Sequence, residues 1–105
     1  MSAQTQAQTP AETAVVHPLI DVLENENEFL LLADLPGVNK DQLELTVDNG
    51  QLAIVGRGDK LEYRRSFALG DDIDIDAIEA SLELGALSLH LPKRAEAKVR
   101  KITIN

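Results

Sequence analysis

One stretch of the chain places acidic side chains at a spacing that resembles a calcium-binding loop. The segment DDIDIDAIEASLE holds Asp72, Asp74 and Asp76 at alternate positions. Glu83 follows at the twelfth position of the loop, which makes a partial EF-hand pattern. Ala77 stands where that pattern needs glycine, and the sequence predicts no helix before the loop. We therefore interpret the segment as an acidic connection between strands and predict no metal site.

The motifs that would support bond-making chemistry are missing from the sequence. It contains no G-x-S-x-G elbow, no phosphate-binding P-loop and no dinucleotide-binding G-x-G-x-x-G. It also contains no cysteine, which excludes thiolate nucleophiles and cysteine-ligated zinc or iron–sulfur sites. We predict that the protein is not an enzyme, has no catalytic residues and binds no cofactor.

The remaining residues that could take part in chemistry or binding have simpler interpretations. His17 and His90 are the only imidazoles, and they lie at opposite ends of the predicted domain in sequence. His90 alternates with leucines on either side, a pattern typical of an outward-facing position on a strand. The tripeptide Arg57-Gly58-Asp59 matches an adhesion motif, but the chain has no export signal, so we interpret the tripeptide as a hairpin turn.

Length and charge limit the classes of protein that remain. With 105 residues, of which 44% are hydrophobic, the chain can form one core. No run approaches the roughly 18 apolar residues of a membrane span, and we expect a soluble, cytoplasmic protein. The net charge of -8 argues against nucleic acid and membrane surfaces as partners. Residues 93–105 are basic, in contrast to the acidic remainder of the chain.

The clearest structural signal is a β-hairpin in LELTVDNGQLAIVG. Asn49-Gly50 can adopt the positive φ angles of a type I′ turn between two alternating strands. The turn predicts that Val47 lies opposite Leu52 and that Leu45 lies opposite Ile54. The apolar residues of both strands then share one face.

A second hairpin is predicted in IEASLELGALSLHLPK. Apolar residues alternate up to Leu84, and the phase of the alternation changes at Gly85. A two-residue turn over either Leu84-Gly85 or Gly85-Ala86 is compatible with this pattern. Since leucine is strained at a positive φ angle, Gly85-Ala86 is the favoured turn. Pro92 is predicted to end the second strand.

The other segments complete an all-β pattern. LIDVLENENEFLLLADLPG reads as two strands around Asn25 to Asn27, and Phe29 to Ala33 is apolar on both faces, which predicts a central strand. Leu61 to Leu69 supplies a further strand, and six strands in hairpins predict an antiparallel β-sandwich with an aliphatic core. Residues 1–16 are predicted to be a disordered arm, residues 17–92 the sandwich, and residues 93–105 a basic extension.

The chain has Ile102 and Ile104 one residue apart, so in a strand both side chains lie on one face. The nine residues from Lys93 to Lys101 reach about 30 Å when extended, which is enough to cross to another subunit. The segment can equally pair in cis as a last strand, or remain without a partner.

Four motifs in order resemble the α-crystallin domain of the small heat-shock proteins. They are ADLPGVNKDQLELTVDNGQLAIVGR (residues 33–57), YRRSFAL (residues 63–69), ASLELGAL (residues 80–87) and the Ile-x-Ile of Ile102 and Ile104. The resemblance covers about residues 17–104. It implies an immunoglobulin-like β-sandwich, a dimeric building block, and a chaperone that holds unfolding proteins without ATP.

The resemblance also implies which residues serve binding. The Ile-x-Ile segment, here called the anchor, is expected to dock in a groove of a neighbouring subunit between the strands Leu43 to Val47 and Ile78 to Leu84. The implied groove and client-binding residues are Leu43, Leu45, Val47, Ile78, Leu82 and Leu84. A purely structural role in the core is the alternative for each of them.

A subunit interface is implied at Tyr63, Arg65 and Phe67. The arginine is expected to form ion pairs there, and the alternative is a solvated surface side chain.

The sequence departs from the family pattern in ways that leave two other functions open. Only Gly58-Asp59-Lys60 connects two strands that the family usually joins by a long, exchanged loop, so we expect a tight hairpin and no strand-swapped dimer. The amino-terminal arm is short and lacks aromatic residues. One alternative is a co-chaperone-type adaptor that binds a folded partner. The other is a subunit that functions only when assembled with a longer paralogue.

Overall fold

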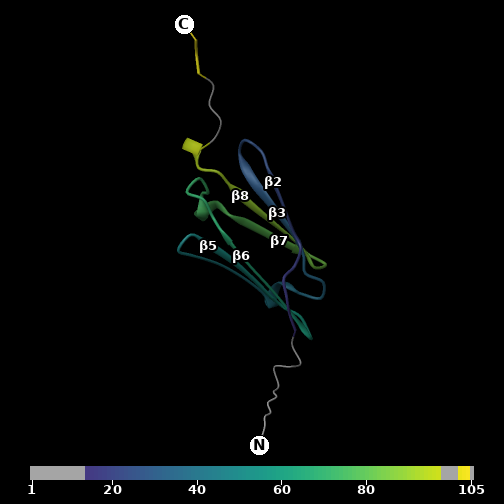
Figure 1. Cartoon of the computed structure of the whole chain (residues 1–105). Coiled ribbons are helices and arrows are strands. Elements are labelled where there is room, and N and C mark those ends of the chain that lie inside the picture. The colour runs from purple at the N-terminus through teal and green to yellow at the C-terminus, as the bar shows by residue number, and fades with distance from the viewer. Residues whose placement is uncertain (1–13, 98–101, 105) are drawn as a thin grey trace, which may run out of the picture.

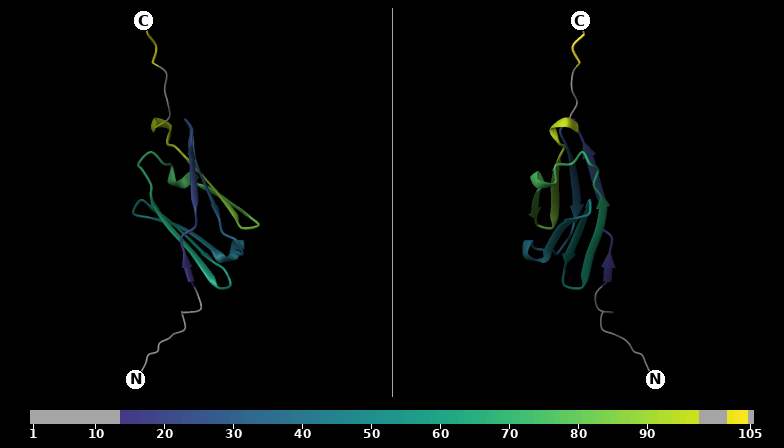
Figure 2. Two further views of the ribbon diagram at one scale, coloured as in Figure 1. Left: turned by 45° about the vertical axis from the view of Figure 1, so that its right-hand side comes forward. Right: turned by 90° about the vertical axis from the view of Figure 1, so that its left-hand side faces the viewer.

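The computed structural model describes residues 14–97 and 102–104, and within them eight strands form two four-stranded sheets (Figure 1). The strands are β1 (Ala14–Val16), β2 (Ile20–Glu24), β3 (Glu28–Asp34), β4 (Leu43–Asp48), β5 (Gln51–Arg57), β6 (Leu61–Ala68), β7 (Glu79–Glu83) and β8 (Ala86–Pro92). Three short 3-10 helices, η3 (Lys40–Gln42), η4 (Ile75–Ala77) and η5 (Ala95–Ala97), lie in the connections. The strand orders are β1-β6-β5-β4 and β2-β3-β8-β7. The two sheets lie face to face (Figure 2), so the predicted all-β sandwich is confirmed.

The hairpin around Asn49-Gly50 has the predicted register. Val47 lies opposite Leu52, and Leu45 lies opposite Ile54. Asn49 and Gly50 have φ angles of 52° and 73°, which only glycine and short polar residues adopt readily. Local turn chemistry and the period-two pattern therefore suffice to set this pairing.

The turn between β7 and β8 differs from the favoured prediction. Glu83 pairs with Ala86, so the turn is over Leu84 and Gly85, with φ angles of 50° and 81°. The backbone N–H of Leu35 donates a hydrogen bond of 2.6 Å to the carbonyl of Gly85. A Cβ on residue 85 would lie 2.9 Å from the Leu35 carbonyl oxygen, so glycine is needed there. This contact with the loop after β3 outweighs the strain at Leu84.

The core lies between the sheets and is mainly aliphatic. β3 lies between β2 and β8, as its apolar faces predicted, and β8 continues to β7. Tyr63 is the one aromatic side chain among the buried hydrophobic residues. The buried set is Leu31, Ala33, Leu35, Val38, Leu52, Ile54, Tyr63, Ile73, Leu82, Leu87, Leu89 and Leu91.

Strand β6 makes two sets of contacts in the first sheet, one with β5 and one with β1. The N–H of Gly58 donates a 2.8 Å hydrogen bond to the carbonyl of Leu61, and this closes the predicted tight hairpin between β5 and β6. β1 pairs in parallel with the start of β6, with Ala14 opposite Leu61 and Val16 opposite Tyr63. For Ala14–Val16 the prediction of a disordered arm is therefore wrong, and the rest of that predicted arm lies outside the described residues.

Candidate functional site

The groove that the sequence predicted corresponds to a surface between β4 and β7. These are the last strands of the two sheets and lie on the same side of the sandwich. A hollow of about 370 Å³ lies between them. It is lined by Lys40, Leu43, Ala80, Ser81, Leu82 and Glu83. The groove therefore combines two leucines with a lysine and a glutamate of opposite charge.

The structure brings most of the predicted groove residues to this side of the molecule. Four of the apolar residues are half-buried and pack against the core, namely Leu43, Leu45, Val47 and Ile78. Leu82 is buried, at 7% exposure, and it lines the hollow together with Leu43. Of the six predicted groove residues, Leu43 and Leu82 line the hollow and also support the core, whereas Leu45, Val47 and Ile78 do not line it.

Leu84 lies apart from the other groove residues. It occupies the first position of the β7–β8 turn, is fully exposed and does not line the hollow. The sequence did not identify Lys40, Ala80 or Ser81 as lining residues. Lys40 begins the 3-10 turn before β4, so no periodic pattern within a strand could reveal its place beside β7.

The anchor residues are exposed to solvent in this structure of a single chain. Ile102 and Ile104 are 88% and 91% exposed. The residues that link them to the sandwich, 98–101, lie outside the described residues, and so does Asn105. Docking of the anchor in the groove of a neighbour remains a prediction.

The predicted interface residues on β6 make contacts within their own chain. Tyr63 is buried, and its hydroxyl lies 3.4 Å from the carbonyl oxygen of Pro36. Arg65 donates a hydrogen bond of 3.2 Å to the carbonyl oxygen of Pro18. The Arg65 guanidinium also lies 5.0 Å from the centre of the Phe67 ring. A subunit interface at these residues would have to displace or share these contacts.

The edge of β6 is partly covered by the chain itself. β1 pairs with Leu61–Tyr63, and the Nδ1 atom of His17 lies 3.0 Å from the carbonyl oxygen of Arg64. The segment after β1 therefore runs along the edge of β6 before it crosses to β2. β1 and His17 thus cover the edge of β6 from Leu61 to Arg64.

The first residues after β8 are fixed to the sandwich by several contacts. Lys93 Nζ lies 2.7 Å from Glu24 Oε2 and 5.0 Å from the centre of the Phe29 ring. The N–H of Arg94 donates a 2.7 Å hydrogen bond to the carbonyl of Asp72. The basic extension thus leaves the domain beside the β2–β3 turn and the loop that follows β6.

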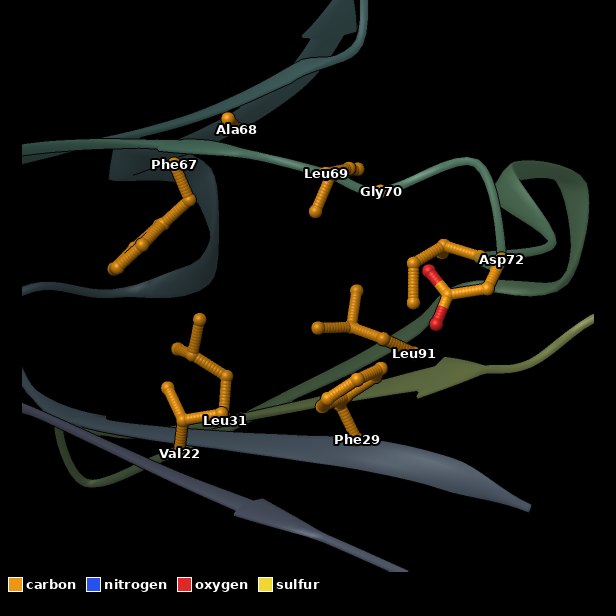
Figure 3. Close-up of a pocket in the computed structure, with 10 residues that line it drawn as sticks. Val22, Phe29, Leu31, Phe67, Ala68, Leu69, Gly70, Asp72 and Leu91 are labelled. Carbon is orange, nitrogen blue, oxygen red and sulfur yellow. The ribbon is translucent and has the colours of Figure 1, made fainter. Parts of the chain in front are cut away.

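A second opening lies on the opposite side of the sandwich, between β2 and β6, and the sequence did not predict it. We call it the side pocket, and its volume is about 390 Å³ (Figure 3). It is lined by Val22, Phe29, Leu31, Phe67, Ala68, Leu69, Gly70, Asp72, Ile73 and Leu91. These residues come from β2, β3, β6, β8 and the loop after β6, so no local pattern could reveal their convergence.

Among the described residues, no helix has the length and hydropathy of a membrane span. Within residues 14–97 and 102–104, no group of three or more histidine, cysteine or acidic side chains is placed to hold a metal ion. His90 Nδ1 instead contacts Glu28 Oε1 at 3.2 Å on the outer face of a sheet.

Comparisons with known proteins agree on one family. The model of the Hsp20/alpha crystallin family matches residues 21–105. Small heat shock protein C4 of Rickettsia felis is 29% identical over 107 residues, covering 87% of this chain and 66% of the relative. The 18 kDa heat shock protein of Clostridium acetobutylicum is 34% identical over 97 residues, covering 75% of this chain and 64% of the relative. The chain thus spans about two thirds of the length of these relatives.

A solved structure shares the fold. The small heat-shock protein from Xylella fastidiosa is 35% identical and has a TM-score of 0.69. The match covers 84% of this chain and 95% of that one. That protein is described as having a distinct high order structure.

Proposed function

The chain belongs to the Hsp20/alpha crystallin family, and we propose that it is an ATP-independent holding chaperone that binds unfolding proteins and prevents their aggregation. The observation that carries the proposal is the family match, which extends over residues 21–105 and so includes every strand from β2 to β8 except the first residue of β2. Holding of clients and self-association are the expected activities. A cytoplasmic location is part of the same proposal.

The proposed mechanism begins with docking of the anchor in the groove of a neighbouring subunit. An extended segment that adds to the edge of β4 or β7 gains main-chain hydrogen bonds. Each isoleucine gains about 1.5 to 3 kcal/mol on full burial, largely offset by ordering of the linker and lost translation. A single docked anchor is therefore weak, whereas many docked anchors hold an assembly together by avidity.

Opening of a docked anchor provides the client site in this mechanism. Leu43 and Leu82 line the groove, and the unpaired edges of β4 and β7 flank it. An unpaired edge beside apolar side chains can accept an extended apolar segment of a non-native protein. The acidic surface of the sandwich keeps such a complex in solution.

The tight β5–β6 hairpin and the partly covered edge of β6 favour a second candidate, the co-chaperone-type adaptor. An adaptor binds one folded partner and remains a monomer whether or not the anchor is intact. The third possibility is co-assembly with a longer paralogue, and it requires the partner to be added before any client is held.

Heating a thermally labile client with increasing amounts of this protein tests the proposal. The proposed chaperone lowers light scattering at stoichiometric excess and without nucleotide. Unchanged scattering at excess contradicts the proposal for the chain alone, and the adaptor then becomes the favoured function. Serum albumin at equal mass is the control for nonspecific protection.

A further inference from the structure

The side pocket has the properties of a docking site for an extended segment. It is nearly all apolar, and Asp72 is the one charged residue among the ten that line it. Its volume of about 390 Å³ falls within the range of roughly 300 to 1,000 Å³ that is usual for clefts that bind ligands. Figure 3 shows Val22 and Leu31 on one sheet facing Phe67 of β6 and Leu69, the first residue after β6. The space between the two sheets is thus open to solvent at this side.

A free strand edge borders this pocket. β2 is the last strand of its sheet and pairs with β3 alone among the described strands. Its sequence, IDVLE, has no lysine or proline, and its two charged residues are Asp21, on the outer face, and Glu24, which is paired with Lys93. Val22 lines the pocket and is 54% exposed, although it faces inward. An extended segment added to this edge would place every second side chain on the same face as Val22.

The segment between β1 and β2 closes the other half of this side of the sandwich. Arg65 donates a hydrogen bond to the carbonyl of Pro18, and the His17 ring contacts the carbonyl of Arg64. The free space is thus limited to the end of β2 that lies nearest the loop after β6. A short segment with two apolar side chains fits this space, whereas a long strand would meet Pro18.

The linker that carries the anchor leaves the sandwich beside this opening. Asp72, on the wall of the pocket, accepts a hydrogen bond from the N–H of Arg94 through its backbone carbonyl. Ala95–Ala97 form the 3-10 helix η5, so the free part of the linker runs from Ala97 to Ile102, five steps that span about 16 Å when extended. The linker is therefore long enough for the anchor to turn back onto its own domain. A short linker also gives an effective concentration in the millimolar range, which a neighbouring chain reaches only in concentrated protein.

Charge favours the same occupant. The linker sequence contains Lys98, Arg100 and Lys101, and their charge is opposite to that of Asp71 and Asp72 in the loop after β6. Opposite charges attract more strongly at low ionic strength and are screened beyond about 10 Å at 0.1 M salt. The period-two spacing of Ile102 and Ile104 matches the one inward-facing row that an added strand presents.

We propose that the side pocket is a second docking site, occupied by Ile102 and Ile104 of the same chain, and that this docking in cis competes with docking in the groove of a neighbour. In the docked state the anchor lies along β2, with its isoleucines against Val22 and Phe67. The chain then withholds its own anchor from assembly. The competition rests on the proposed function, whereas the docking itself does not.

Engineered disulfides test the docking directly, because the chain contains no cysteine. Val22→Cys is combined with Ile102→Cys or with Ile104→Cys, since either isoleucine can lie opposite residue 22. Directly opposite residues on adjacent antiparallel strands have Cα atoms about 4.5 to 5.5 Å apart, within the range of a disulfide. Leu23→Cys provides the matched control, because Leu23 is 55% exposed on the opposite face of the same strand, compared with 54% for Val22.

In dilute, mildly oxidised protein, at least one Val22 pair should form a disulfide within the chain about tenfold faster than either Leu23 pair. Equal rates for the two faces of β2 would overturn the proposal. Disulfides that form only between chains would also overturn it, because the occupant would then be the anchor of a neighbour. Mass spectrometry under non-reducing conditions distinguishes these products.

The competition has its own test, which uses Val22→Ser and Leu23→Ser in the chain without added cysteines. Val22→Ser should release the anchor and raise the mean particle mass, whereas Leu23→Ser should leave it unchanged. An unchanged mass in Val22→Ser overturns the competition. The disulfide result does not depend on client holding. If the Val22 disulfide forms rapidly but the protein fails the light-scattering assay, the proposed function is contradicted and the docking site is supported.

Discussion

The two open sides of this sandwich differ in how the chain crosses between the sheets. At the groove, β4 and β7 belong to separate hairpins, and the hollow between them is lined partly by Lys40, Ser81 and Glu83. At the side pocket, the segment after β1 crosses from β6 to β2 and closes half of the opening, and the remaining lining is almost entirely apolar. Connectivity therefore leaves one side open along a mixed polar edge and confines the other to a small apolar space.

This difference suggests different occupants for the two surfaces. An open edge with charged residues suits reversible docking of a segment from another molecule, because polar groups at the rim remain solvated. A confined apolar space beside the start of the linker suits the anchor of the same chain. The predictions below separate the two surfaces, from the largest expected effect to the smallest.

The largest effect should come from the core that both surfaces share. Leu89 is fully buried on β8, between the strands that carry the groove and those that carry the side pocket. Leu89→Ala should lower the free energy of unfolding by about 2 to 5 kcal/mol, because it leaves a cavity. Urea unfolding measures the loss, and Ser88→Ala on the outer face of the same strand is the control. If Leu89→Ala loses less free energy of unfolding than Ser88→Ala, the assignment of Leu89 to the core is contradicted.

A smaller effect of opposite sign is expected at the turn that ends β7. Leu84 is fully exposed at a φ angle of 50°, so it carries strain without burying its side chain. Leu84→Asn should raise the free energy of unfolding by about 1 kcal/mol, since asparagine tolerates this conformation. Leu84→Val should lower it, because branching at Cβ adds strain. Equal stability of the two variants, measured in urea, would show that the turn has another conformation.

Leu84→Asn also tests whether the groove extends to the turn between β7 and β8. Because Leu84 does not line the groove hollow, Leu84→Asn should leave anchor-dependent particle mass unchanged. A smaller particle for Leu84→Asn would instead indicate that this leucine contacts a docked segment.

The smallest effect on stability is expected from a contact that lies beside the side pocket and away from the groove. Lys93 contacts Glu24 and lies over the ring of Phe29, which lines the pocket. Lys93→Met should cost about 0.5 to 1 kcal/mol of stability, because the ion pair is partly exposed and the ring contact is modest. The same substitution in a Glu24→Gln background should cost less, and urea unfolding of all four proteins measures the coupling. An equal cost in both backgrounds would show that the loss of stability does not come from the ion pair between Lys93 and Glu24.

The parts of the fold that could be predicted from sequence depend on local rules. The Asn49-Gly50 turn sets its register because positive φ angles and period-two alternation act within 14 residues, LELTVDNGQLAIVG. The central place of β3 follows from its apolar residues on both faces. The family resemblance is confirmed by the match over residues 21–105.

The parts that could not be predicted depend on contacts between distant residues. The turn at Leu84-Gly85 is held by a hydrogen bond from Leu35. β1 pairs with Leu61–Tyr63, a contact between residues about 47 positions apart, and its three residues, AVV, are too few for a periodic pattern. The side pocket brings together residues from Val22 to Leu91, and no motif within any one segment marks it.

The most direct test of the central claim is the mass of the assembled particle, measured by sedimentation velocity over a range of protein concentrations. The account predicts that the intact chain forms particles heavier than a dimer, and that the double substitution Ile102→Ala with Ile104→Ala reduces them to the dimer or below, while Thr103→Ala does not. A chain that remains monomeric at every concentration, or a particle whose mass is the same with and without the two isoleucines, would contradict the claim that the anchor holds neighbouring subunits together.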